Sequence, residues 1–252
     1  MDVEKYLERI CYDGPLDRSI GTLRGLHRSH ILTVPFEDLD IHLGRRIVLD
    51  QDALFDKIVE RRRGGFCYEL NGLFAGLLRE IGFEVEMLSA GVAGPNGFGP
   101  DFDHMALRVV LDEDWLADVG FGDSFIEPIR LEESAVTEDA TGLYRVNADG
   151  PNRLMSRRDH DEPAEGIWNP QYRFSLEARE LMDYQEMCVY QETSPESHFT
   201  QRRLCSLATE TGRITLTDLK LIVTSNGVRE ERMLSGEDEF RSVLAKSFRI
   251  AL

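Results

Sequence analysis

The sequence lacks the features that define several other classes of protein. No apolar run reaches about 18 residues, and the first residues lack the charged and apolar regions of a signal peptide, so we expect neither a membrane span nor secretion. The four cysteines show no C-x-x-C pair and no zinc-ligand spacing, which argues against a metal site and against a disulfide framework. We therefore expect a cytoplasmic protein without a metal.

Positive charge is also scarce. The 29 Lys and Arg residues stand against 46 Asp and Glu residues, which gives a formal net charge of −17, and only four of the basic residues are lysines. Such a chain repels polyanions, so nucleic acid and anionic membranes are not expected as partners. Hydrophobic residues make up 42% of the sequence, which is enough for a packed core. A monomer or a homodimer fits this composition.

One cysteine stands at the start of a predicted helix. Cys67 follows Gly64 and Gly65, and the apolar residues after it recur at the spacing of one helix face as far as Gly82, where a C-terminal cap is expected. A helix N-terminus stabilises negative charge, and the thiolate is the reactive form of cysteine. The alternative is that Cys67 is a small buried apolar residue, because free cysteine is among the most buried residue types.

A histidine and a carboxylate follow Cys67 in the chain, at His104 and Asp118. An ordinary thiol, with a pKa of about 8.5, is only roughly 3% thiolate at pH 7. An imidazole within hydrogen-bond reach takes the thiol proton, and a carboxylate on the other ring nitrogen selects the tautomer. The three residues thus supply a nucleophile, a candidate base and a carboxylate suited to orient that base.

Taken together, five segments in this order resemble the arylamine N-acetyltransferase family, and the resemblance covers nearly the whole chain. Asp38 and Asp103 depart from the family's pattern, which more usually has asparagine and threonine at these positions. Arg202 and Arg203 replace an asparagine-containing pair. The matching segments are residues 34–40, 63–71, 103–105, 118–122, and 194–199 with 204–209.

The resemblance implies an α+β fold of three domains with a cysteine-protease-like Cys-His-Asp triad. Residues 1–84 would form an N-terminal helical bundle that carries Cys67. Residues 85–190 would form a central β-barrel that carries His104 and Asp118, and residues 191–252 a C-terminal α/β lid. By the same resemblance Cys67 is the acetylated nucleophile, His104 its base and Asp118 the orienting acid.

The activity implied is acetyl transfer by a ping-pong mechanism through an acetyl-cysteine intermediate. Acetyl-coenzyme A would be the donor, and the acceptor the nitrogen of an arylamine, arylhydrazine or hydrazide, as in xenobiotic metabolism. Four phenylalanines of the matched segments would form a flat apolar cleft for the aromatic acceptor, with core packing as the alternative. They are Phe36, Phe66, Phe121 and Phe199.

Two further segments are candidates for contacts with the coenzyme. Gly97, Phe98 and Gly99 belong to a glycine-rich loop whose backbone amides we expect to approach the phosphates, although no helix or lysine follows as in a P-loop. A plain surface loop is the alternative. Residues 61–63 are all arginines that would attract the anionic coenzyme, or else form a solvated helix end.

Periodicity and turn signals place the triad residues on predicted elements. Helices are expected over about 3–10, 19–30, 51–62, 67–81 and 235–245, with short strands between 84 and 155 and again between 204 and 233. A three-residue turn at 112–114 would set His104 opposite Gly122. His104 and Asp118 would then lie four residues out of register, so a bulge or a different pairing is needed. His27, His30 and His42 are interpreted as packing or surface residues.

Three alternatives stay open on the sequence alone. Macrolactam-forming amide synthases of polyketide biosynthesis share the triad motifs of this family. A Cys-His-Asp hydrolase, such as a protease or a transglutaminase-like enzyme, would use the same residue types without coenzyme A. A non-enzymatic binding protein would bury an inert Cys67.

Overall fold

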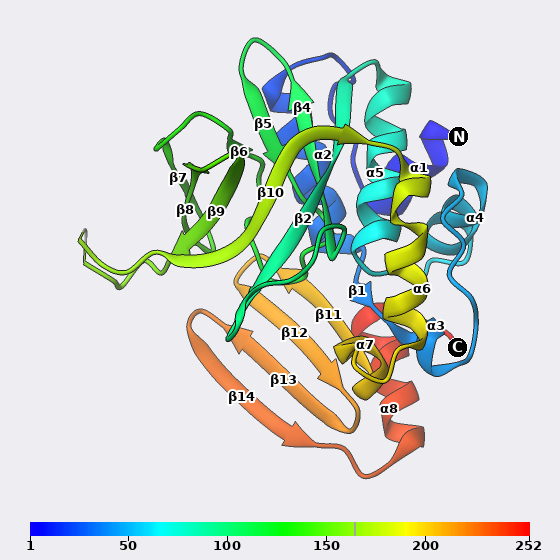
Figure 1. Cartoon of the computed structure of the whole chain (residues 1–252). Helices are drawn as coiled ribbons and strands as arrows, with labels where there is room; N and C mark the ends of the chain where they lie inside the picture. Colours follow the sequence, from blue (N-terminus) through cyan, green and yellow to red (C-terminus); the bar gives the residue numbers. More distant parts are fainter. Residues whose placement is uncertain (164) are drawn as a thin grey trace.

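Helices form the N-terminal part of the molecule (Figure 1), in a computed structural model that describes residues 1–163 and 165–252. They are α1 (Val3–Ile10), α2 (Ile20–Thr33), α3 (Leu39–His42), α4 (Gln51–Phe55), which continues as a π-helical turn (Asp56–Glu60), and α5 (Cys67–Ile81). The Asp2 side chain accepts a hydrogen bond from the backbone nitrogen of Lys5, as the sequence predicts. Gly82 ends α5 with a φ of 103°, a conformation that glycine adopts without strain.

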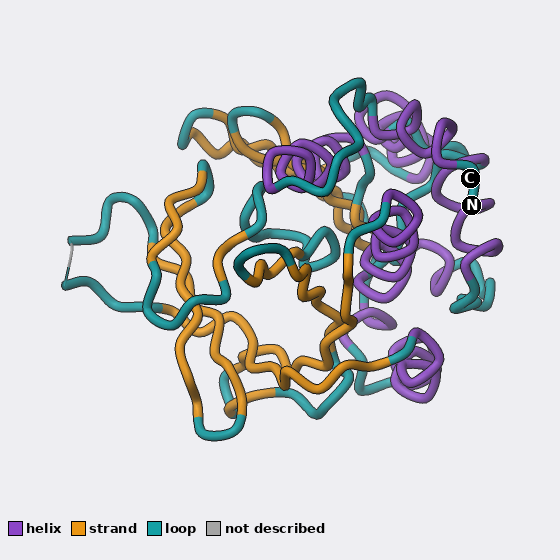
Figure 2. The backbone as a smooth tube through the Cα atoms, turned by 90° about the horizontal axis from the view of Figure 1, so that it is seen from above, coloured by secondary structure: helices purple, strands orange, loops and turns teal. Residues whose placement is uncertain are grey.

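Antiparallel strands of the middle part form a large sheet that curls into a nearly closed barrel (Figure 2). They are β2 (Glu84–Gly94), β3 (Gly97–Phe98), β4 (His104–Val110), β5 (Asp114–Ala117), β6 (Ile129–Arg130), β7 (Val136–Asp139), β8 (Gly142–Asp149), β9 (Asn152–Arg158) and β10 (Asn169–Arg179). The strand order is β6-β5-β4-β2-β10-β9-β8-β7, and β3 pairs with β2. A bridge between Glu133 and Val146 brings the segment after β6 to β8, so the two ends of the sheet approach each other.

The hairpin that carries His104 and Asp118 has a different register from the predicted one. Val110 pairs with Asp114, so the turn begins one residue earlier than expected. The shift brings Asp118 two residues closer to His104, into a diagonal position across the strand pair, where long side chains reach each other. The contact therefore needs no bulge.

A smaller antiparallel sheet joins one strand of the helical part to strands of the C-terminal part of the chain (Figure 1). Its strands, in spatial order, are β1 (Phe36–Glu37), β11 (Leu204–Thr209), β12 (Gly212–Thr217), β13 (Lys220–Ser225) and β14 (Val228–Met233). Asn226 and Gly227 have φ angles of 49° and 77° in the last hairpin, as is typical of an Asn-Gly turn. α8 (Glu237–Val243) starts after Gly236, slightly later than the helix predicted from residue 235, and Ser235 donates hydrogen bonds to Glu239.

Two elements between residues 85 and 193, β10 and α6 (Gln185–Thr193), were not predicted from the sequence. β10 is long, but charged residues on its exposed side and a register shift between Phe174 and Ala178 obscure its alternation in the sequence. α6 is helical and crosses the predicted boundary at residue 190. Cys188 on α6 and Cys205 on β11 are fully buried. Within the described residues, no helix combines the length and the apolar character needed to cross a membrane.

Candidate active site

The helix that carries Cys67 starts at a tightly packed turn. A Cβ atom on Gly64 would lie 1.9 Å from the carbonyl oxygen of Pro35, so only glycine allows this approach of the two backbones. The Glu69 carboxylate accepts a hydrogen bond of 3.1 Å from the backbone nitrogen of Phe66 and so caps the first turn of α5. Cys67 itself is 3% exposed at the N-terminus of this helix.

A buried group of charges anchors this turn. Lys57 Nζ lies 2.8 Å from Asp40 and 2.7 Å from Glu69. Arg63 lies 2.7 Å from Glu37 and 3.1 Å from Asp40. The prediction of a solvated helix end or a coenzyme contact is therefore wrong for Arg63, which is 2% exposed and bound to carboxylates of the protein.

His104 and Asp118 form the hydrogen bond expected of a base and its orienting acid. Nε2 of His104 lies 2.7 Å from Oδ2 of Asp118, and both side chains are buried. The other oxygen, Oδ1, accepts hydrogen bonds from the Asn71 side chain (2.9 Å) and from the backbone nitrogen of Gly120 (3.0 Å). Because Nε2 is engaged by the carboxylate, Nδ1 is the ring nitrogen left to accept a proton.

A second histidine, His27, is hydrogen-bonded to the backbone of Asp118. His27 is fully buried, and its Nε2 accepts a hydrogen bond of 2.9 Å from the backbone nitrogen of Asp118. Its Nδ1 lies 2.7 Å from the carbonyl oxygen of Ile126, so the ring bridges two segments as the neutral tautomer. Burial lowers the pKa of His27 to about 4, which keeps it neutral at physiological pH. The sequence offers no signal for this role.

The pKa values of Cys67 and Asp118, both buried, are shifted in opposite directions. Burial raises the pKa of the Cys67 thiol well above its ordinary value, and the charges of Asp103 and Asp118 raise it further. Burial thus opposes the expected stabilisation of the thiolate by the helix N-terminus. Burial also raises the pKa of Asp118, but the charge of His104 and the hydrogen bonds from His104 and Asn71 outweigh it, so that the pKa is lowered overall.

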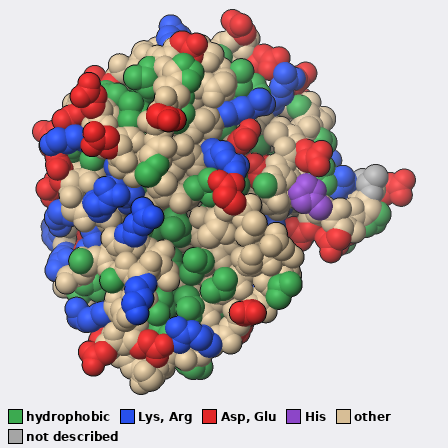
Figure 3. Space-filling model, turned by 180° about the vertical axis from the view of Figure 1, so that it is seen from behind, with side chains coloured by type: hydrophobic (Ala, Val, Ile, Leu, Met, Phe, Trp, Pro, Cys, Tyr) green, Lys and Arg blue, Asp and Glu red, His purple; other side chains and the backbone are tan. Residues whose placement is uncertain are grey.

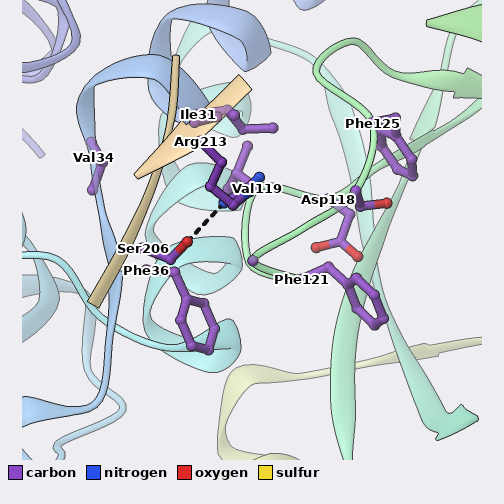
Figure 4. A pocket seen from close by; sticks show the side chains of 12 residues that line it. Ile31, Val34, Phe36, Asp118, Val119, Phe121, Phe125, Ser206 and Arg213 are labelled. Carbon is purple, nitrogen blue, oxygen red and sulfur yellow. Dashed lines mark hydrogen bonds between the residues drawn. The ribbon is translucent and has the colours of Figure 1, made fainter. Parts of the chain in front are cut away.

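Cys67 and His104 line one pocket of about 330 Å³ at the junction of α5, the barrel and the smaller sheet. Gly120 packs closely on Cys67, since a Cβ atom on Gly120 would lie 2.8 Å from the Cα of Cys67. A small hollow adjoins this pocket, and Figure 4 shows Phe36, Phe121 and Arg213 around it beside Asp118. The residues that line the pocket of Cys67 are Phe36, Cys67, Val92, Asp103, His104, Gly120, Phe121, Gly122, Asp123, His198, Phe199, Leu204, Ser206, Arg213 and Thr215.

The four phenylalanines singled out in the sequence lie in two positions relative to this pocket. Phe36, Phe121 and Phe199 line it. Phe66 is fully buried and packs edge to face on Phe199, with ring centroids 5.5 Å apart. Phe66 is therefore not accessible to a ligand, but it contacts Phe199, which lines the pocket.

The loop of Gly97, Phe98 and Gly99 is more regular than expected. Gly97 and Phe98 form β3, which pairs with the end of β2. Gly99 packs on the carboxylate of Asp103, because a Cβ atom at Gly99 would lie 2.2 Å from Oδ2. The loop thus lies next to one wall of the pocket. Among the described residues, no group of three or more His, Cys, Asp or Glu side chains is placed to hold a metal ion.

Comparison with known proteins identifies the family. A family model described as N-acetyltransferase matches residues 19–252. The arylamine N-acetyltransferase of Escherichia coli is 35% identical over 248 residues, which cover 96% of this chain and 86% of the relative. The chain belongs to the arylamine N-acetyltransferase family. As a member of this family, it is an acyltransferase.

Solved structures of family members have the same fold. The arylamine N-acetyltransferase of Salmonella typhimurium superimposes with a TM-score of 0.91 at 32% identity, over 98% of this chain and 90% of that one. The enzyme of Mycobacterium marinum, solved in complex with CoA, gives a TM-score of 0.90 at 32% identity, over 99% and 93%. Proansamycin X synthase of Amycolatopsis mediterranei is 31% identical over 97% of this chain and 96% of the relative, so the family also contains enzymes with a different name and product.

Proposed function

We propose that the protein transfers an acetyl group from acetyl-coenzyme A to the nitrogen of an arylamine, arylhydrazine or hydrazide, through acetyl-Cys67. The observation that carries the proposal is the position of His104, which is hydrogen-bonded to buried Asp118 and lines the same pocket as Cys67. An aromatic pocket in a member of this family suits an arylamine acceptor. A cytoplasmic location, a monomeric or homodimeric state and the three-domain division of the chain stay predictions.

In the first half-reaction, the proton of the Cys67 thiol moves to Nδ1 of His104. Because burial raises the pKa of this thiol, proton transfer to His104 is needed to form the nucleophile. The thiolate attacks the thioester carbonyl, a new carbon–sulfur bond forms, and coenzyme A leaves with the proton of His104. Backbone amides next to Cys67 are suited to stabilise the oxyanion.

In the second half-reaction, the acceptor amine attacks the carbonyl carbon of acetyl-Cys67. His104 takes the amine proton as the carbon–nitrogen bond forms, and the Cys67 thiolate leaves and is reprotonated. Phe36, Phe121 and Phe199 are proposed to hold the flat ring of the acceptor and to keep water from the thioester. Phe66 is proposed to support Phe199 from behind.

Two places near the pocket suit the phosphates of the coenzyme. One is the loop of Gly97, Phe98 and Gly99, whose backbone amides are proposed contacts. The other is a cavity of about 720 Å³ that shares Asp123, Arg213 and Thr215 with the pocket of Cys67 and is also lined by Arg28, Arg157 and Arg229. Seen from behind, basic side chains lie around a hollowed, partly apolar area in the lower half of the molecule (Figure 3). Such a concentration of arginines is unusual in a chain of net charge −17. Each of these arginines already lies beside a carboxylate of the protein, so the phosphates would compete with those ion pairs.

A stopped-flow experiment with acetyl-coenzyme A alone tests the proposed mechanism. We expect a burst of one equivalent of free coenzyme A per active site, because the acetyl group stays on Cys67 when no acceptor is present. Mass spectrometry should find a gain of about 42 Da, the mass of an acetyl group replacing a hydrogen, on the peptide that contains Cys67. No burst, or a label on Cys188 or Cys205 instead, would disprove the assignment.

The second candidate function is macrolactam formation, which the similarity to proansamycin X synthase favours. An amide synthase should form an acyl-enzyme but handle free anilines poorly. Addition of a 4-substituted aniline or a hydrazide to the acetylated enzyme therefore separates the two functions. Rapid transfer supports the acetyltransferase, whereas a stable acetyl-enzyme that transfers to no aromatic amine or hydrazine supports the amide synthase.

A further inference from the structure

Asp103 places a carboxylate in the wall of the active-site pocket. It directly precedes His104 in the sequence and lines the same cavity as Cys67. Val92 and Phe199 belong to the same lining, as does His198, which interacts electrostatically with Asp103. A charged group in such a place affects every ligand that enters the pocket, because electrostatic interactions are stronger where water is partly excluded.

Hydrogen bonds hold this carboxylate in position. Oδ2 accepts from the backbone nitrogen of Val92 (3.2 Å), and Oδ1 accepts from Nε2 of Gln191 (3.0 Å). The orientation of the Gln191 amide follows from Ser197, whose hydroxyl donates to Oε1 of Gln191 (2.6 Å) while its oxygen accepts from the backbone nitrogen of Phe199 (3.2 Å). Both oxygens of Asp103 therefore face donors, which is the bonding of an ionised carboxylate with lone pairs left for a ligand.

The charged groups near Asp103 decide whether its own charge is available to a ligand. Among the described residues, none forms an ion pair with Asp103 at the distances that define one. Burial lowers the pKa of His198 in the same pocket, which keeps that ring neutral near pH 7. Arg213 also lines the pocket but is engaged by Asp123 at 3.4 Å and by the hydroxyl of Ser206 at 3.1 Å. A negative charge is thus available to the ligand at this wall.

We propose that Asp103 determines acceptor specificity, favouring aromatic amines that carry a cationic substituent and disfavouring those that carry a carboxylate. The inference rests on the proposed acetyl transfer and adds the class of acceptor to it. A cationic substituent would lie beside the carboxylate of Asp103 while the ring occupies the phenylalanine-lined part of the pocket. A carboxylate substituent would meet like charge in a partly dehydrated site.

The test compares three acceptors of similar size in the wild type and in the Asp103→Asn variant. The probes are 4-aminobenzylamine, which is cationic on its side chain, neutral 4-methylaniline and anionic 4-aminobenzoate. Because the three amines differ in intrinsic reactivity, the measured quantity is the ratio of kcat/KM between variant and wild type for each acceptor. Relative to the ratio for the neutral amine, we expect this ratio to be roughly tenfold lower for the cation and roughly tenfold higher for the anion, mainly through KM.

Three comparisons make the result decisive. Asp101→Asn removes an exposed carboxylate two residues away and should leave all three ratios near one. Asp103→Glu keeps the charge and should keep the order of preference. In the wild type, high salt should weaken the preference for the cation, which gives a readout even if Asp103→Asn fails to fold.

Two outcomes would overturn the inference. Equal ratios for the three acceptors in Asp103→Asn would show that Asp103 acts on the chemistry at Cys67 and not on the acceptor. If salt does not change the preference of the wild type for the cationic acceptor, charge does not determine that preference. Failure of the proposed function is distinguishable, because it would abolish the coenzyme A burst of the wild type before any acceptor is added.

Discussion

At the scale of single residues, the environment of Asp118 decides which nitrogen of His104 can act as the base. Oδ1 of Asp118 is occupied by two donors, the Asn71 amide and the backbone nitrogen of Gly120, so Oδ2 is the oxygen that faces His104. A carboxylate can accept on both oxygens, and this keeps the proton of His104 on Nε2. Nδ1 is then free to accept the proton of the thiol.

Asp118→Asn should therefore impair acetylation much more than its small change in shape suggests. Its Oδ1 would stay with Asn71 and Gly120, so the amide nitrogen would face Nε2 of His104 and force the ring proton onto Nδ1. That tautomer cannot accept the proton of Cys67, and by analogy with serine triads we expect a loss of about 10⁴-fold in the rate of acetylation. Stopped-flow release of coenzyme A measures this rate.

Alkylation of Cys67 by iodoacetamide at pH 6 should slow in parallel in the Asp118→Asn variant, because fewer molecules carry the imidazolium–thiolate pair. Wild-type rates in both measurements would show that Asp118 does not orient His104.

At the scale of secondary structure elements, the start of α5 depends on buried charges from three segments. Lys57 of the π-helical turn after α4 lies between Asp40 of α3 and Glu69 of α5. Glu69 in turn caps the turn that presents Cys67. A buried ion pair adds little net stability, but the loss of one partner leaves an uncompensated charge in the interior.

Lys57→Met should destabilise the protein by about 3–5 kcal/mol, since Asp40 and Glu69 would lose their shared cation. Urea unfolding measures the change. Lys5→Met is a matched control, because Lys5 forms exposed pairs with Asp2 and Glu60 and should affect unfolding little. An equally small effect of the two substitutions would mean that the buried charges do not hold the start of α5.

At the scale of the whole molecule, Asp38 joins the helical part to the smaller sheet. Its carboxylate accepts a hydrogen bond of 2.7 Å from the backbone nitrogen of Leu204, and its own backbone nitrogen donates to the Leu204 carbonyl (3.2 Å). Burial raises the pKa of Asp38 to about 8 from an ordinary 3.8. The folded state therefore holds a proton that the unfolded state releases, so this group makes stability fall as the pH rises from about 4 to about 8.

Asp38→Asn should stabilise the protein, and the gain over the wild type should grow from pH 5 to pH 8 to the order of a few kcal/mol. The amide oxygen keeps the bond to Leu204 while the titration disappears. The difference in unfolding free energy between the two proteins at each pH isolates this group, because the other titrating residues are shared. A pH-independent difference would show that Asp38 does not titrate in the folded state. Asp101→Asn, at an exposed position, is the control.

The features of this protein that depend on near neighbours in the chain could be predicted from the sequence. The α5 helix with its Gly82 cap and the Asn226-Gly227 hairpin follow from local periodicity and from residues that tolerate positive φ. Membership of the family could also be predicted, because its motifs are continuous segments. The residue types of the candidate triad were likewise visible in the chain.

How those features meet in space depends on tertiary packing. The turn that begins one residue earlier, the position of His27 beneath Asp118 and the burial of Arg63 among carboxylates were not visible in the sequence. The residue pattern of one strand does not specify its register with the neighbouring strand. A charged or imidazole side chain is predicted to be exposed unless the distant segments that supply its hydrogen-bond or ion-pair partners are known. Those partners lie far away in the chain, and packing of the complete core is what brings them together.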